Sequence, residues 1–388
     1  MKNPLNKAFS GWKILIAISI GVLISGWMLY RSVSKTQFIE VAHGTGGFEW
    51  VDSNGNQQVD YSDPNEFVVA ASGNYDKKTL ADALHQIEWT SQTWLWLFIA
   101  CCFMLGRDLF YMLRIRLLTK KQLSWKASFY VIMLWEFASA LSPGVVGGSA
   151  VAMFIMNRET IPFGKATAIV IITLFMDNLF YVVMIPFVFL FIQSADLFPA
   201  NQSPSEFLMW WFWGGFSIIF FLCVLLYLTI FWYPQLTTRF LLFIFRLPFL
   251  KRWKFVAREW GKDIERASVE FKQEPRSYWV KTFLFTLGSW TCRYLVLNAI
   301  LNAFLHLDLF ENMLALGKQL VLWLFMLVSI TPGGSGVAEY GFGELLSTFT
   351  TSSLLLAAMA IIWRLISYFP YLFIGSILLP RWMRRTNL

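Results

Sequence analysis

The stretch Ser329–Leu346 reads SITPGGSGVAEYGFGELL, and it interrupts an otherwise apolar part of the chain with a proline, several glycines and the acidic residue Glu339. Proline and glycine break helices, and a lipid bilayer offers no water to pair with the backbone groups that a break exposes. Such backbone is tolerated at membrane depth only where protein or a polar cavity surrounds it. The stretch therefore predicts a broken membrane helix whose break has a function.

The composition places the chain among membrane proteins. Of its 388 residues, 57% are hydrophobic and 14% are charged, which is too apolar for a soluble protein of this length. Runs that reach or approach the roughly 20 apolar residues needed to cross a bilayer fall near 12–30, 93–113, 127–141, 163–192, 207–232, 281–304, 313–330 and 353–379. We therefore predict an all-α polytopic membrane protein. Because the three histidines are scattered and the four cysteines lie in apolar runs, we expect no metal site, no cofactor and no enzyme activity.

Loop charges predict the orientation of the spans, because basic residues concentrate in cytoplasmic loops. Residues 31–90 carry an acidic excess and residues 233–280 a basic excess, so we place the first segment outside and the second inside. Basic residues also place both termini, and the loop that begins at Arg114 after the apolar run 93–113, in the cytoplasm, which predicts a multi-pass protein of the cytoplasmic (inner) membrane. This orientation is consistent along the chain only if the segments broken by SPGVVGG and TPGGSG return to the side from which they entered.

The two breaks match each other in sequence. Ser142-Pro143-Gly144-x-x-Gly147 corresponds to Thr331-Pro332-Gly333-x-x-Gly336, and the units that contain them enter the membrane in opposite orientations. Secondary transporters share this inverted-repeat architecture, in which paired broken helices mark the binding site. We predict about six full spans and two re-entrant hairpins. The chain divides into a membrane span (1–30), an extracytoplasmic insert (31–90), a first repeat unit (91–192) with a hairpin at 127–157, a connecting span (193–232), a basic cytoplasmic segment on the membrane surface (233–280) and a second repeat unit (281–380) with a hairpin at 313–347.

Two segments outside the repeat units have patterns of their own. In the insert, FEWVDSNGNQQVDY predicts a β-hairpin around Asn54-Gly55. Asp52, Asn54, Asn56 and Asp63 loosely match a calcium-binding loop, although the glycine is misplaced. The basic segment 233–280 suits helices that lie on anionic inner-leaflet lipids, and topogenic charge alone explains it equally well.

The breaks indicate where a substrate binds. A broken helix exposes N–H groups at the positive end of the next helix dipole, and glycines let a ligand approach the backbone closely. We therefore expect an anion to bind at the glycines of both breaks, Gly144, Gly147, Gly333, Gly334 and Gly336. Charges inside spans cost roughly 2.5–3.5 kcal/mol each on insertion scales. The basic residues Arg293, Arg364 and Lys318 are the predicted contacts for a phosphate.

The acidic residues inside the spans have two interpretations. Glu136 and Asp177 would bind a coupling proton or balance the bases of an empty site, and fixed ion pairs that lock the hairpins explain them equally well. Asp177 and Arg364 hold near-equivalent places in the two units and could meet across the repeat interface. For Arg107 and Asp108 we favour a structural ion pair near the cytoplasmic end of its span. For Glu339, beside the second break, we favour a functional role.

The chain resembles the lysylphosphatidylglycerol synthase transmembrane region family, a flippase-like domain. The resemblance covers about residues 90–380 and is carried by TPGGSGVAEYGFGELL, AAMAIIWRLISYFPYLFIGSI, SPGVVGG and TLFMDNLFY. It places Glu339, Arg364 and Tyr368 on motif positions of the family. Gly148 and Ala152 stand where many relatives have an acid and an arginine, which weakens the prediction of a phosphate contact in the first hairpin. The resemblance implies translocation of a phospholipid or polyprenyl-linked lipid, or support of an enzyme that makes one.

These observations favour a lipid transporter that moves an anionic or modified phospholipid, or a lipid-linked precursor, between leaflets. The alternatives are a small-ion channel or exchanger, and an accessory subunit of a lipid or cell-envelope biosynthetic enzyme. A site sealed from lipid would favour the ion pathway, and a lateral opening between spans would favour lipid. The expected partners are the lipid substrate and anionic inner-leaflet lipids, without nucleic acid, and a homo-oligomer remains open.

Overall fold

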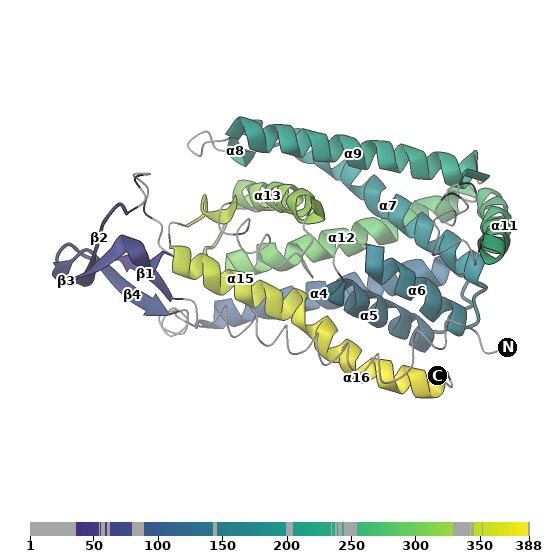
Figure 1. Ribbon diagram of the computed structural model, residues 1–388, viewed down its shortest axis with the longest axis horizontal. Coiled ribbons are helices and arrows are strands. Elements are labelled where there is room, and N and C mark those ends of the chain that lie inside the picture. The colour runs from purple at the N-terminus through teal and green to yellow at the C-terminus, as the bar shows by residue number, and fades with distance from the viewer. Residues whose placement is uncertain are drawn as a thin grey trace.

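The computed structural model describes residues 36–53, 55, 59, 63–79, 89–142, 146–198, 205–233, 235–236, 239, 243, 254–328, 342, 345–350 and 352–386 (Figure 1). The predicted span 1–30 lies outside these residues, as do Gly144, Gly333, Gly334, Gly336 and Glu339. Most of the described residues form helices that run along the long axis of the molecule, with a small β-sheet at one end.

The helices account for the predicted apolar runs. They are α4 (Ser91–Leu118), α5 (Trp125–Leu141), α6 (Val146–Arg158), α7 (Phe163–Phe189), α8 (Ser194–Leu197), α9 (Ser205–Phe231), α11 (Lys254–Lys272), α12 (Arg276–Phe304), α13 (Leu309–Val328), α15 (Ser353–Ser367) and α16 (Phe369–Arg385). Within the described residues, five segments are long and apolar enough to cross a membrane: Ser91–Leu118, Phe163–Phe189, Met209–Phe231, Arg276–Phe304 and Leu355–Arg385. The predicted class, an all-α polytopic membrane protein, is confirmed.

Helices α4 and α12 form the most extensive helix–helix contact and run in opposite directions. A Cβ added at Gly106 of α4 would lie 3.3 Å from Cys292 Sγ, whereas nearer the other end of α4 the Tyr278 hydroxyl donates to the Leu117 carbonyl at 3.4 Å. Glycines let membrane helices approach this closely. Because α4 and α12 are the first helices of the two predicted units, their opposite directions agree with an inverted repeat.

Helices α5 and α6 pack against each other as a helical hairpin. A Cβ added at Gly148 would overlap Ser139, so the glycine is needed for the close approach of the two helices. At 1.5 Å per residue, α5 and α6 are about 26 Å and about 20 Å long, short of the roughly 30 Å of a bilayer core. Neither helix is long enough to cross a bilayer unaided, and the depth that they reach stays a prediction.

The predicted span 353–379 is divided into α15 and α16 at Tyr368. Tyr368 departs from helical geometry with φ −123° and ψ −56°, and Pro370 follows in the first turn of α16. A proline lacks the N–H that would continue the helical ladder, and its ring crowds the carbonyl four residues earlier. The proline accounts for this break, and the segment Leu355–Arg385 as a whole is still long and apolar enough to cross a membrane, as predicted.

The insert contains a four-stranded sheet in the order β1-β4-β2-β3, built from β1 (Thr36–Glu40), β2 (Gly46–Trp50), β3 (Phe67–Gly73) and β4 (Tyr75–Thr79). β2 pairs with β3, so the strand that follows the predicted turn at Asn54-Gly55 and pairs with β2 begins at Phe67, later than predicted; Asn54 and residues 56–58 and 60–62 lie outside the described residues. The physical reason is the apolar core of the sheet, where Phe67 stacks on Phe38 with ring centroids 4.0 Å apart. The Asp63 carboxylate of the loosely matched calcium loop accepts from the Asn65 N–H at 2.9 Å and caps a 3₁₀ turn.

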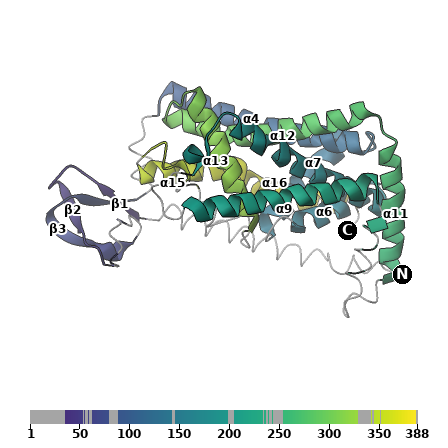
Figure 2. The same cartoon turned by 90° about the horizontal axis from the view of Figure 1, so that it is seen from above.

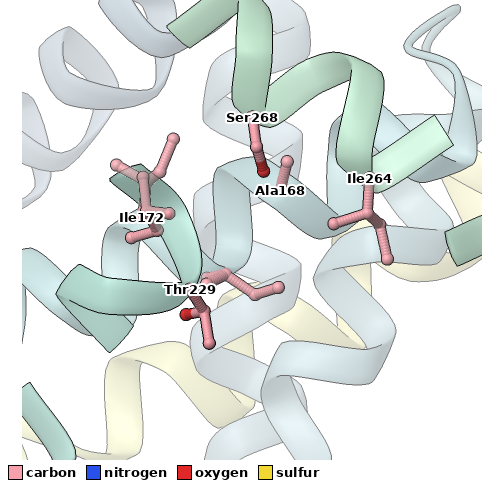
Figure 3. Close-up of a pocket in the computed structure, with 7 residues that line it drawn as sticks. Ala168, Ile172, Thr229, Ile264 and Ser268 are labelled. Atoms are coloured by element: carbon pink, nitrogen blue, oxygen red, sulfur yellow. The ribbon is translucent and has the colours of Figure 1, made fainter. Parts of the chain in front are cut away.

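Helix α11 is the described part of the basic segment, and it stands across the end of the bundle away from the sheet (Figure 2). Its buried face consists of Ile264, Ala267, Ser268 and Phe271, a spacing typical of an amphipathic helix. Figure 3 shows the crevice where α7, α9 and α11 meet, lined by Ala168, Ile171, Ile172, Thr229, Ile230, Ile264 and Ser268. Lys120, just after α4, pairs with Glu270 and Glu274 at 2.9 and 2.6 Å and ties α11 to the bundle.

Candidate functional site

Arg107 lies far inside the bundle and is fully buried, with 0% of its surface exposed. It is 16 residues after the first residue of α4 and 11 before the last, so it lies about 16 Å from the C-terminal end of this helix. Its Nη1 pairs with Asp108 Oδ1 at 3.0 Å, and its Nη2 pairs with Glu136 Oε1 at 2.6 Å. One guanidinium thus joins two carboxylates between α4 and α5, and the side of the membrane to which the nearer end of α4 belongs stays a prediction.

Tyr371 of α16, in the predicted second repeat unit, contacts both Arg107 and Asp108. Its hydroxyl accepts from Arg107 Nη1 at 2.6 Å and donates to Asp108 Oδ1 at 2.8 Å. The sequence analysis did not identify Tyr371. No signal in the sequence distinguishes Tyr371 from the other tyrosines of the apolar runs.

A second buried ion pair joins α4 to α7. Arg114 Nη1 donates to Asp177 Oδ1 at 2.5 Å, and the Trp290 indole of α12 donates to the same oxygen at 2.9 Å. Arg114 also donates to Thr286 Oγ1 at 3.0 Å. Arg114 directly follows the predicted apolar run 93–113 and is expected in a cytoplasmic loop, but it lies within α4 and only 4% of its surface is exposed. The described partners of Asp177 are therefore Arg114 and Trp290 rather than the expected Arg364.

Aromatic rings join the two groups and bring in Arg293. The Tyr111 ring lies 4.8 Å from the Arg107 guanidinium and 4.7 Å from that of Arg114. The guanidinium of Arg293 lies 5.2 Å from the centroid of the Trp290 ring, whose indole N–H donates to Asp177. We call these six charged residues the central charge cluster: Arg107, Asp108, Arg114, Glu136, Asp177 and Arg293.

The central charge cluster holds three guanidinium groups and three carboxylates, and both predicted repeat units contribute to it. Helices α4, α5 and α7 supply five of the six residues, and α12 supplies Arg293. Isolated charges at this depth would be expensive, and pairing compensates them. Two arginines are engaged by carboxylates, whereas Arg293 forms no ion pair with a carboxylate of the described residues. Arg293 is therefore the cation of the cluster best placed to receive an anion.

Arg364 and Tyr368 lie together at the break between α15 and α16. The Arg364 guanidinium is buried and lies 5.1 Å from the centroid of the Tyr368 ring. The Tyr368 hydroxyl donates to the carbonyl of Ala140 at 3.0 Å, at the end of α5. Gly147 is the second residue of α6, on the other side of the first break. The break in the last span therefore abuts the first hairpin, one helical turn beyond Glu136.

Lys318 lies apart from these residues, near the C-terminal end of α7. Its Nζ donates to Thr348 Oγ1 at 2.7 Å, and the adjacent Gly317 packs against Val188 and Leu197. A network of side-chain amides fixes α13 to α12 and so sets this position: Asn298, Asn302, Asn312 and Gln319. The structure thus brings together five of the predicted charges, Arg107, Asp108, Glu136, Asp177 and Arg293, and places Lys318 elsewhere.

In the part of the chain that the structure describes, no group of three or more His, Cys, Asp or Glu side chains has an arrangement that would hold a metal ion. The acidic residues of the central charge cluster are engaged by arginine, tyrosine and tryptophan donors. The chemistry available there is charge pairing, anion binding and proton exchange.

Comparisons with known proteins agree with this membrane architecture. The family described as the lysylphosphatidylglycerol synthase TM region matches residues 67–375. The match begins within the predicted insert, so the family pattern extends further toward the N-terminus than residue 90. A UPF0104 membrane protein of Archaeoglobus fulgidus is 24% identical over 298 residues, which cover 73% of this chain and 85% of that protein. No solved structure matches the chain.

Proposed function

The chain belongs to the lysylphosphatidylglycerol synthase TM region family, and from this premise we propose that it moves a phosphate-bearing lipid between the two leaflets of its membrane. The family name refers to the synthase of a phospholipid. Our proposal is a transporter rather than an enzyme, in the cytoplasmic membrane with both termini inside. The central charge cluster is the observation that carries the proposal.

The stability of the fold does not by itself explain why charged side chains are buried at the interface of the two predicted repeat units. Replacing a buried ion pair by apolar side chains of similar volume is often neutral or stabilising, so packing alone does not require six such residues. In inverted-repeat transporters the substrate site lies near the midplane between the units. The cluster is drawn from α4, α5, α7 and α12, which supports a binding site at that interface.

The charge balance of the interior favours an anionic ligand. The three bases and three acids of the cluster are matched, and Arg364 and Lys318 add two further buried basic side chains among the described residues. Arginine binds phosphate oxygens through paired N–H donors. A headgroup phosphate would contact Arg293 and Arg364, while the acyl chains remain in the bilayer.

Helix α11 supports a second contact with lipid, at the inner surface. Its outer face exposes Lys262, Arg266 and Lys272, and its apolar face packs on the bundle. Basic residues near an anionic leaflet contribute about 1 kcal/mol each. We propose that α11 rests against anionic headgroups and orients the cytoplasmic end of the protein.

Purified protein in liposomes tests the proposal with fluorescently labelled phosphatidylglycerol and a membrane-impermeant quencher. We expect faster transbilayer movement than in protein-free liposomes. Arg293→Gln and Arg364→Gln each remove a charge-assisted hydrogen bond worth about 1.5–3 kcal/mol, so movement should slow about tenfold to hundredfold. Arg384→Gln, an exposed position near the end of α16, is the matched control and should leave the rate unchanged. Equal rates in all four proteins would show that the arginines do not handle the lipid.

A further inference from the structure

We infer that Lys318 and Thr348 form a second binding site for a phosphate group, separate from the central charge cluster and nearer to the end of the bundle that carries the sheet (Figure 1). For a lipid ligand the inference rests on the proposed function, because a headgroup that moves between leaflets needs contacts beyond those at Arg293. Free inorganic phosphate presents the same chemistry to the site without acyl chains.

Lys318 is a buried ammonium group with few partners for its charge. Only 1% of its surface is exposed, and its Nζ donates to Thr348 Oγ1 at 2.7 Å. Within the described residues Lys318 forms no ion pair with a carboxylate. An ammonium group has three N–H donors, and burying it without a counter-charge is costly. Lys318 is therefore suited to bind an anion.

Acidic residues that are close to Lys318 in the fold are engaged elsewhere or exposed. At the start of α13, Asp308 accepts from the Glu311 N–H at 2.7 Å, and Glu311 accepts from the Asp308 N–H at 2.9 Å, so these two carboxylates cap the helix. Asp196 belongs to α8, which packs against α13, but its side chain is exposed. These contacts leave the Lys318 ammonium available to an external anion.

The packing of α13 fixes the direction of the Lys318 side chain. Gly317 faces α7 and α8, and Gln319 donates to Asn298 Oδ1 of α12 at 2.8 Å. Because successive residues of a helix point about 100° apart, Lys318 faces neither of these contacts. It reaches instead to Thr348, in the turn that follows the stretch with the second break.

The Thr348 hydroxyl provides a second donor and access from outside the bundle. Its oxygen accepts from the Lys318 ammonium, so its O–H is directed away from Nζ and can donate to another acceptor. Thr348 is exposed, so a ligand can reach the pair without crossing the core. A phosphate oxygen beside both groups would receive one charge-assisted hydrogen bond from the ammonium and one from the hydroxyl.

The position of Lys318 suits a second contact on the path of the proposed lipid phosphate. Its neighbour Gln319 bonds to Asn298, which follows Arg293 by five residues on α12. At 1.5 Å per residue, the two levels are about 8 Å apart along α12. A phosphate that leaves Arg293 toward the end of the bundle with the sheet would therefore meet a second buried cation.

Equilibrium dialysis of the purified full chain tests the inference, because it counts bound ligands. The two probes are radiolabelled inorganic phosphate and dihexanoyl phosphatidylglycerol. Lys318→Met keeps the length of the side chain without its charge and should bind one phosphate group fewer per chain than the wild type, whereas Lys318→Arg should keep the site. Thr348→Val should weaken binding at this site about tenfold. Lys121→Met, at an exposed position just beyond α4, is the matched control and should bind like the wild type.

The number of bound phosphate groups separates this inference from the proposed function. A decrease from two to one in Lys318→Met supports both sites, and a decrease from one to none supports the Lys318 site and refutes the site at Arg293. Unchanged binding in Lys318→Met and in Thr348→Val would overturn the inference. Thr348 is exposed, so Thr348→Val decides the question if Lys318→Met does not fold.

The two probes identify the source of the phosphate group. Loss of lipid binding in Lys318→Met supports a lipid site, and loss of inorganic phosphate binding alone supports a site for the free anion. Asp196→Asn, which removes the exposed carboxylate of α8, should bind either probe at least as tightly as the wild type; weaker binding would overturn the inference. Failure of both probes to bind to the wild type would refute this site and the site at Arg293 together.

Discussion

The ion pair between Arg114 and Asp177 provides the sharpest test of the charge arrangement. Both residues are held by neighbours from other helices: Arg114 donates to Asp177 at 2.5 Å, and Asp177 also accepts from Trp290 at 2.9 Å. The relevant substitutions are Arg114→Met, Asp177→Leu and the two together, because Met and Leu keep the volume while removing the charge.

The magnitudes follow from burial. Removing one member of a buried ion pair leaves the other charge uncompensated, which costs about 3–5 kcal/mol. Each single variant should therefore lose about that much free energy of unfolding. The double variant removes both charges and leaves the Trp290 N–H without its acceptor, which costs about 1–3 kcal/mol. The double variant should thus be more stable than either single variant.

Reversible unfolding in mixed detergent micelles, followed by circular dichroism, measures these differences. The control is the same cycle at Lys120 and Glu270, whose side chains pair at 2.9 Å but are each 41% exposed, so each variant should lose less than about 1 kcal/mol. If the losses at Arg114 and Asp177 simply add, the two side chains are not coupled, and the ion pair that we describe between α4 and α7 is wrong.

Three further predictions concern packing, pH and exposure. Gly375→Ala should lower stability by about 1–3 kcal/mol in a thermal shift assay, because a Cβ there would overlap Phe137. Gly214→Ala, with open space around it, should not lower it, and equal losses would contradict the packing of α16 on α5. Lys120 and Lys165 lower the pKa of Glu270, so its contribution is complete above the ordinary glutamate value of about 4.3 and is lost as the pH falls through the lowered pKa. Glu270 should therefore lower the free energy of unfolding by less than about 1 kcal/mol as the pH falls from 5 to 3. Chemical denaturation should show a smaller decrease for Lys120→Ala than for the wild type. An identical decrease in both proteins would rule out the ion pair between Lys120 and Glu270. Cys101 and Cys102 are exposed on α4 within a span, so a polar maleimide should leave them unmodified in vesicles when Cys223 and Cys292 are replaced. A cysteine at Lys121→Cys, just beyond α4, should react with the maleimide when its side of the membrane faces the reagent. If Cys101 and Cys102 were labelled as strongly as this cysteine, the face of α4 that carries them would not be in contact with lipid.

Much of the architecture was predictable because membrane spans leave a strong signal in the sequence. The apolar runs that we identified correspond to α4, α7, α9, α12 and the α15–α16 segment, each long enough to cross a bilayer. The charges inside these runs are rare and costly, so they were identified one by one as candidates. Five of them then met in the central charge cluster.

The partners of these charges could not be predicted, because they depend on how each helix is rotated and on which helices are neighbours. Asp177 pairs with Arg114, an arginine near the end of its span that the loop-charge rule assigned to the cytoplasm. That rule uses only the position of an arginine relative to the apolar runs, so it cannot distinguish a buried arginine at the end of a helix from one in a loop. Tyr371 was missed for a similar reason: in an apolar run, a tyrosine gives no sign of whether its hydroxyl reaches a charged group.

Local breaks were harder to predict than spans. Pro370 divides α15 from α16, although the run around it looks continuous in hydropathy. In the insert, the turn sequence Asn54-Gly55 predicted that the strand pairing with β2 would follow at once. The strand that pairs with β2 is instead Phe67–Gly73, whose first residue packs against Phe38. In both cases a single residue with a specific packing role determined the outcome.

A structure of the protein in lipid nanodiscs containing phosphatidylglycerol tests the central claim most directly. The account predicts density for a headgroup phosphate within hydrogen-bonding distance of Arg293, between the helices of the two repeat units, and loss of that density in Arg293→Gln. Lipid bound only around the outer surface of the bundle, with Arg293 occupied by a side chain of this protein, would contradict the claim.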